Sequence, residues 1–133
     1  MALFRCSSGG GGGLTRTELW NTGTIPSTYS GGTITLSDSM LNYDYLELEW
    51  KQTASADSAR LLVPVSDFVA FGGGGDSGAK YYFGQRSSVN SARYFAYGGS
   101  NTSVTIGADY RLNAAASYNN LDFPISITGI KVG

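Results

Sequence analysis

The stretch that decides the fold is YLELEWK, residues 45–51. Its apolar residues Leu46, Leu48 and Trp50 alternate with charged ones, and successive side chains of a β-strand point to opposite faces of a sheet. A helix would instead place Glu47 and Trp50 on one side and mix the two kinds of residue. The stretch therefore predicts an antiparallel strand with one face in an apolar core and the other in water.

Working outward, two-residue alternation begins at Leu14 and recurs along the chain. The further predicted strands are residues 33–36, 60–65, 80–86, 93–97, 103–112 and 123–132, and residues 67–71 are apolar and predicted to be extended. Glycine-rich or polar loops separate them at residues 72–78, 98–101 and 113–120. About eight short strands separated by turn residues predict an all-β, jelly-roll-like antiparallel β-sandwich.

Two of these strands carry more detailed predictions. In the strand 103–112 the apolar face comprises Val104, Ile106, Ala108, Tyr110 and Leu112. In the last strand the apolar residues change parity after residue 127, which predicts a β-bulge at Gly129.

The chain has 133 residues, the usual length of one domain, and we expect the sandwich to span residues 14–133. Residues 1–13 contain five consecutive glycines, which have a high ordering entropy and no side chains to pack. They are predicted to form a flexible arm, either a disordered tail or a segment whose apolar Leu3 and Phe4 dock on a neighbouring protein.

Charge and cysteine content narrow the range of partners. The net charge is −1, so no basic field attracts nucleic acid or anionic membrane. Near-neutral charge favours association into oligomers. Cys6 is the one cysteine, as in proteins that fold in a reducing compartment, and no stretch of ~20 apolar residues predicts membrane insertion. The apolar segment before Cys6 is too short for a signal peptide, so synthesis in the cytoplasm without secretion is expected.

The residues available for catalysis are few. The chain has no histidine, which removes the commonest general base and the commonest metal ligand. Glu47 and Glu49 share a strand face, but they are ~7 Å apart along it and predicted to lie in solvent. Asp38 and Asp44 are expected to cap turns. We therefore expect no enzymatic activity, no cofactor and no metal site.

Aromatic residues give the strongest indication of a binding surface. Tyr82 shares its parity with Lys80 and Arg86, whereas Tyr81 and Phe83 have the opposite parity. One of these two faces belongs to the core, so Tyr82 is predicted to lie outside between two cations.

Three further tyrosines, Tyr43, Tyr94 and Tyr97, lie near loops or in an aromatic-rich strand. An exposed tyrosine offers a rigid flat ring with a hydroxyl group, which suits stacking on a sugar or a protein interface. With Tyr82, these are the candidate ligand or interface residues; the alternative for each is a partly buried packing role.

Several short motifs carry a resemblance to a known class of proteins. They are LWNT at residues 19–22, GTITLS at 32–37, NYDYLELE at 42–49 and FPISITGIK at 123–131. This pattern resembles tail proteins of tailed bacteriophages and prophages, which occur as tips of tail fibres and as small virion proteins. The opening segment followed by a glycine run is also similar to short phage structural proteins.

The resemblance implies a β-sandwich, often in homotrimers, that sits in the virion and contacts the host surface, for example a glycan, or a neighbouring virion protein. It transfers no binding residue to this chain. Two alternatives stay open: a head decoration or assembly scaffold protein without a host ligand, and a carbohydrate-binding module outside any virus.

Overall fold

The structure, a computed structural model, describes residues 13–71, 80–84, 91–111 and 119–133. The described residues form nine strands, one α-helix and one short 3₁₀ helix. The strands are β1 (Leu14–Asn21), β2 (Gly32–Thr35), β3 (Tyr45–Lys51), β4 (Ser58–Pro64), β5 (Lys80–Phe83), β6 (Ser91–Tyr97), β7 (Ser103–Ile106), β8 (Tyr110–Arg111) and β9 (Phe123–Val132), and the helices are η2 (Met40–Asn42) and α1 (Val65–Phe71).

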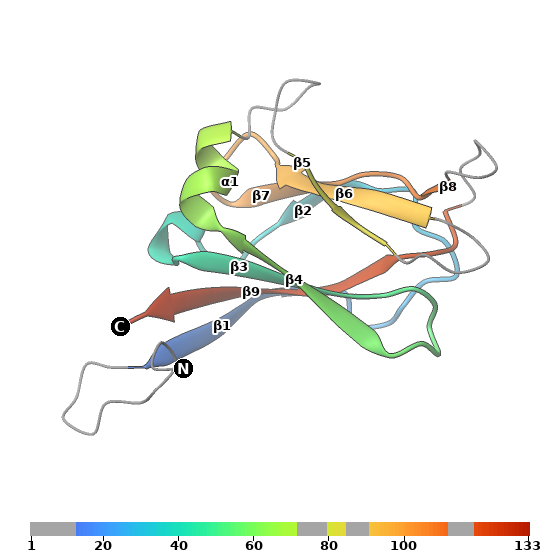
Figure 1. Ribbon diagram of the computed structural model, residues 1–133, viewed down its shortest axis with the longest axis horizontal. Helices are drawn as coiled ribbons and strands as arrows, with labels where there is room; N and C mark the ends of the chain where they lie inside the picture. The colour runs from blue at the N-terminus through green and yellow to red at the C-terminus, as the bar shows by residue number, and fades with distance from the viewer. Residues whose placement is uncertain (1–12, 72–79, 85–90, 112–118) are drawn as a thin grey trace.

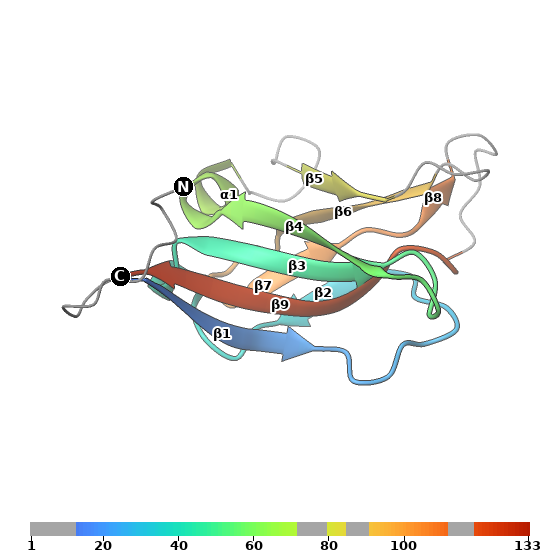
Figure 2. The same ribbon diagram turned by 60° about the horizontal axis from the view of Figure 1, so that its bottom comes forward.

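The strands form two antiparallel sheets that face each other, as Figures 1 and 2 show. One sheet has the order β1-β9-β3-β4 and the other β2-β7-β6-β5, with the short β8 paired to β6. The predicted all-β sandwich is therefore confirmed. Because β1 pairs with β9, the described ends of the chain lie together, and the amide of Gly133 donates to the carbonyl oxygen of Gly13 at 3.0 Å.

The core lies between the sheets and follows the alternation of the deciding stretch. Leu46, Leu48 and Trp50 of β3 are buried, whereas the residues between them are only partly so. The second sheet contributes Ile34, Phe83, Phe95, Val104 and Ile106, and Ile127 of β9 adds to the first sheet's side of the core. The rings of Trp50 and Phe83 meet across the core with centroids 5.5 Å apart.

The segment predicted as extended over residues 67–71 is instead part of helix α1, and that prediction is wrong. Val65 and Phe68 are buried and Val69 is half-buried, at the i, i+3 and i+4 spacing of a helical face. The ring of Phe68 lies 4.9 Å from that of Phe95 in the opposite sheet. The helix lies between the edge strands β4 and β5 in chain order, at one end of the sandwich (Figure 1), and its apolar side packs against the core.

The strand predicted over residues 103–112 is interrupted. β7 ends at Ile106 and β8 begins at Tyr110, and the pairing with β6 shifts by one residue between them. As a result Ala108 is exposed and Asp109 is buried in its place, the reverse of the predicted pattern. A one-residue insertion in a strand changes which residues face inward.

The predicted bulge at Gly129 is also wrong. The register of β9 runs through Gly129 without a shift on both of its neighbours, opposite Thr17 and Leu46. The shifts lie instead at Leu19 of β1 and at Ile125 of β9. Gly129 is needed for a different reason, because a Cβ atom there would lie 2.6 Å from the ring of Tyr43.

Several predictions fall on residues that the structure does not describe. They concern the arm at residues 1–12 with Leu3 and Phe4, the loop 72–78, Arg86, and most of the link 113–120. Within the part of the chain that is described, no helix has the length and apolar character needed to cross a membrane.

Candidate binding face

The outer side of the sheet that contains β5 and β6 brings two of the predicted tyrosines together. Tyr81 and Phe83 of β5 point into the core, which leaves Lys80 and Tyr82 on the outer side. Tyr82 pairs directly with Tyr94 of β6, and 65% of Tyr82 is exposed. The predicted outward position of Tyr82 is therefore confirmed. We call Lys80, Tyr82, Tyr94 and the underlying Gly107 the tyrosine face.

Tyr94 is held in place from both sides. Its ring lies against the backbone of Gly107, where a Cβ atom would approach the ring carbons to 2.2 Å. The amide of Gly107 donates to the carbonyl oxygen of Tyr94 at 2.9 Å, which fixes the two backbones together. The ammonium nitrogen of Lys80 lies 4.8 Å from the centroid of the same ring, a cation–π distance.

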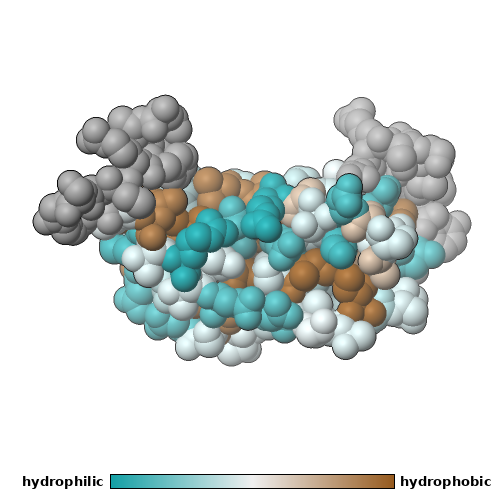
Figure 3. Space-filling model, turned by 90° about the horizontal axis from the view of Figure 1, so that it is seen from below, coloured by the Kyte–Doolittle hydropathy of each residue, from teal (hydrophilic) through white to brown (hydrophobic). Residues whose placement is uncertain are grey.

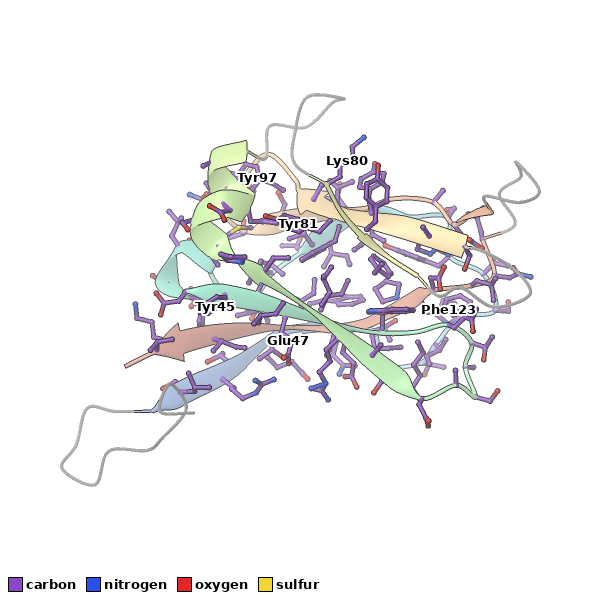
Figure 4. All side chains as sticks on the ribbon, in the orientation of Figure 1. Tyr45, Glu47, Lys80, Tyr81, Tyr97 and Phe123 are labelled. Atoms are coloured by element: carbon purple, nitrogen blue, oxygen red, sulfur yellow. The ribbon has the colours of Figure 1, made fainter. Side chains whose placement is uncertain are left out.

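This arrangement offers three kinds of contact to a ligand. The exposed ring of Tyr82 provides a flat surface for stacking, and the tyrosine hydroxyl groups can donate or accept hydrogen bonds. Lys80 adds a positive charge, and Figure 4 shows its side chain pointing away from the sandwich. All three groups project from paired strands, so a ligand would meet a surface that is already ordered.

The structure places Tyr97 and Tyr43 elsewhere. Tyr97 packs against the core, with its ring edge-on to Phe68 at 6.3 Å, and its hydroxyl donates to Asn101 Oδ1 at 3.0 Å (Figure 4). Tyr43 is half-buried over Gly129. Its hydroxyl donates to Asp38 Oδ2 at 2.9 Å. Neither residue joins the tyrosine face, and both have the packing role that the sequence left open.

Asp38 behaves as predicted for a turn-capping residue. Its carboxylate accepts hydrogen bonds from Tyr43 Oη, Asn42 Nδ2 and the amide of Ser39, at 2.9, 3.0 and 2.8 Å. The bond from Tyr43, followed by those from Asn42 and Ser39, lowers the pKa of Asp38 below its ordinary value. For Asp44 the described residues show a different role: its Oδ2 accepts from the amide of Val132 at 2.7 Å and so ties β9 to the start of β3.

The strand carboxylates lie on the outer side of the other sheet, within ion pairs. Glu47 pairs with Arg16, and with Arg60 at 3.3 Å; Glu49 pairs with Arg60 at 3.7 Å and accepts from Ser126 Oγ at 3.1 Å. Figure 3, which views this side of the molecule, shows hydrophilic surface between separate hydrophobic areas. The two carboxylates point from the same side of one strand, not toward each other across a substrate as glycoside cleavage requires.

A buried arginine is the main feature that the sequence analysis missed. Arg93 of β6 is 1% exposed and lies on the inner side of its sheet. Its Nε donates to the carbonyl oxygen of Leu121 at 3.0 Å and its Nη1 to that of Gly107 at 3.1 Å. The guanidinium also lies 5.1 Å from the ring of Tyr29. The sequence did contain a sign of this position. Arg93 and Phe95 are two residues apart in β6, so their side chains point to the same side of the sheet, and that of Phe95 points inward.

Two buried carboxylates accompany this arginine. Asp109 and Asp122 are both fully buried, and the amide of Leu121 donates to Asp109 Oδ2 at 3.2 Å. Burial lowers the pKa of Arg93, while the charges of Asp109 and Asp122 act in the opposite direction. This cluster joins β6 to both ends of the segment 107–121, so we interpret it as structural.

Comparison with known proteins gives no relative from which a site could be transferred: no family model matches the sequence, and neither does any curated protein. The described residues contain no group of three or more Asp, Glu, Cys or His side chains that could hold a metal ion. We take the tyrosine face as the candidate site, because it combines a mostly exposed aromatic ring with an ammonium group.

Proposed function

We propose that this chain is a structural protein of a bacteriophage virion, an adhesive β-sandwich that contacts the host surface through the tyrosine face. The observation that carries the proposal is the exposed ring of Tyr82 beside Tyr94 and Lys80 on an ordered sheet. The viral setting is supported by the resemblance of its short motifs to phage tail proteins. The proposed ligand is a saccharide of the cell envelope, because tyrosine rings stack on the apolar faces of sugars.

A single small face of this kind gives weak binding, so the mechanism requires several copies. In a homo-oligomer, for which we favour a trimer, identical faces act together through their high effective concentration. The low net charge of the chain supports such association.

Two measurements test the proposal. Gold-labelled antibodies against the chain should label phage particles released by a host that carries its gene, and particles without label at any position would remove the virion assignment. The purified protein should bind host cells, and Tyr82→Ala should reduce binding by at least tenfold. Leu62→Ala is the matched control, because Leu62 is 50% exposed but lies on the other sheet. An equal loss of cell binding in both variants would exclude the tyrosine face as the site that contacts the host.

A decoration or assembly protein without a host ligand is the second candidate. It is favoured by large apolar side chains that are exposed outside the tyrosine face, namely Leu41 at 57%, Leu62 at 50% and Val132 at 40%. Here the arm at residues 1–13, with Leu3 and Phe4, would anchor the chain to a neighbouring virion protein. Deletion of residues 1–13 should then abolish incorporation into particles, whereas Tyr82→Ala should leave it unchanged; the adhesive function predicts an effect of Tyr82→Ala on cell binding.

A further inference from the structure

We infer that the tyrosine face selects saccharides that carry a carboxylate group, with Lys80 as the residue that recognises the acid. This inference rests on the function proposed above and adds the chemical class of the ligand. It is carried by the position of Lys80 and by the charges around it.

The first step concerns what Lys80 contacts within the protein. Three described cations, Arg16, Arg60 and Lys131, form ion pairs, and Arg93 is buried beside two aspartates. Lys80 has no ion pair with any carboxylate among the described residues, and its ammonium group rests on the ring of Tyr94 instead. A ring neutralises no charge, so the positive charge remains available to an anion.

The second step concerns the rest of this surface. The described outward residues of the sheet are small, aromatic or hydroxyl-bearing, and none of them is acidic; they are Thr33 and Thr35 of β2, Tyr82 of β5, Ala92, Tyr94 and Ala96 of β6, and Ser103 and Thr105 of β7. Among these described strand residues, an approaching anion meets the charge of Lys80 and no carboxylate. A described carboxylate near this edge of the sheet is Asp67 of α1, which acts on the inward Tyr81. The opposite sheet differs, because Glu47 and Glu49 stand among its arginines.

The third step is geometric. Tyr82 and Tyr94 are directly paired across two antiparallel strands, so their Cβ atoms are ~5 Å apart. The ammonium group therefore lies over the residue that is directly paired with the exposed Tyr82. A sugar stacked on Tyr82 can place an exocyclic carboxylate beside Lys80, and the single charge of that group matches one ammonium group. Because the contact with Tyr94 already positions the lysine, less side-chain entropy is lost on binding.

The experiment compares two ligands that differ only in charge. Oligogalacturonate and its fully methyl-esterified form are titrated into the full-length protein at low salt, with binding followed by calorimetry or by the amide resonances of β5 and β6. Sialyllactose and lactose provide a second pair. We expect each acidic sugar to bind about tenfold more tightly than its neutral partner, since a charge-assisted contact is lost in the latter.

Substitutions test whether Lys80 causes the preference for acidic sugars. Lys80→Met should weaken binding of the acidic sugar about tenfold and leave binding of the neutral sugar unchanged. Lys80→Arg should retain the preference for the acidic sugar. Lys51→Met is the control, because Lys51 also has no ion pair among the described residues but lies on the other sheet. Tyr82→Ala should weaken binding of both the acidic and the neutral sugar of each pair.

The outcomes separate this inference from the proposed function. Equal binding of acidic and neutral sugars, with both lost in Tyr82→Ala, would overturn the role of Lys80 and retain the saccharide-binding face. Binding of neither pair at millimolar concentrations, or binding unchanged by Tyr82→Ala, would overturn both. If a poly-glutamate peptide competed as strongly as oligogalacturonate, the ligand would not be a saccharide, and the result would point to an acidic protein.

Discussion

The ring of Tyr94 lies on the backbone of Gly107, so closely that a Cβ atom at position 107 would be 2.2 Å from its Cδ2 and Cε2 atoms. Atoms cannot approach to that distance, and the glycine thus sets where the ring can rest. The same glycine begins the interruption between β7 and β8 and accepts a hydrogen bond from Arg93. One residue therefore connects the tyrosine face on the outside with the buried charges on the inside.

Gly107→Ala should displace the ring of Tyr94 and lower the free energy of unfolding by about 1–3 kcal/mol, the usual cost of overpacking. Urea denaturation measures this change. In a Tyr94→Ala background the same substitution should cost much less, because the ring that it strikes is absent. An equal cost in both backgrounds would show that contact with Tyr94 is not the reason for glycine.

Arg93→Met should be strongly destabilising, by about 3–5 kcal/mol, because it removes the cation from two buried carboxylates. Arg60→Met is the matched control. Arg60 pairs with Glu47 and Glu49 at an exposed position, and its loss should cost less than about 1 kcal/mol. Similar costs for the two substitutions, measured by urea denaturation, would contradict the structural role of the buried cluster.

Neighbouring residues of β5 should differ sharply in their effect on stability. Tyr82→Ala should change the free energy of unfolding by less than about 0.5 kcal/mol, since Tyr82 is mostly exposed. Phe83→Ala should cost about 3–5 kcal/mol, since Phe83 is buried against Trp50. If Tyr82→Ala proved as costly as Phe83→Ala, the assignment of Tyr82 to the outer side would be wrong.

The turn at Asp38 should lose stability in acid. Hydrogen bonds hold the pKa of Asp38 below its ordinary value of 3.8, so its ionised form stabilises the folded state. That contribution is complete above the unfolded-state pKa and disappears as the pH falls through the lower, folded-state pKa. The difference in unfolding free energy between wild type and Asp38→Asn should therefore shrink in acid.

An NMR titration of the Asp38 carboxyl group gives the same information directly. A midpoint for Asp38 at or above the ordinary aspartate value would contradict the hydrogen-bonded arrangement.

Much of the sandwich follows from the alternation of apolar residues. The β3 pattern correctly assigned Leu46, Leu48 and Trp50 to the core, and the β5 pattern correctly placed Tyr82 outside. Alternation is informative here because each strand has one dry face, so its parity fixes the direction of every side chain.

The errors have physical causes that act over longer distances. Residues 67–71 are rich in residues that favour strands, yet the space between two edge strands accommodates a helix with Val65 and Phe68 turned inward. The inward position of Asp109 depends on a one-residue insertion after Ile106, which alternation within a single strand does not reveal. The pairing of Tyr82 with Tyr94 was equally out of reach, since it depends on the register between two strands.

The hydrogen bond between Gly133 and Gly13 has a practical consequence for engineering. Since β1 and β9 are neighbours in the sheet opposite the tyrosine face, a label fused after position 133 would be attached to that sheet and not to the sheet of Tyr82. A linker of a few residues should suffice to join position 133 to position 13 and close the backbone into a circle. Such a cyclic form would prevent fraying of both end strands and would leave the proposed sugar-binding surface unchanged.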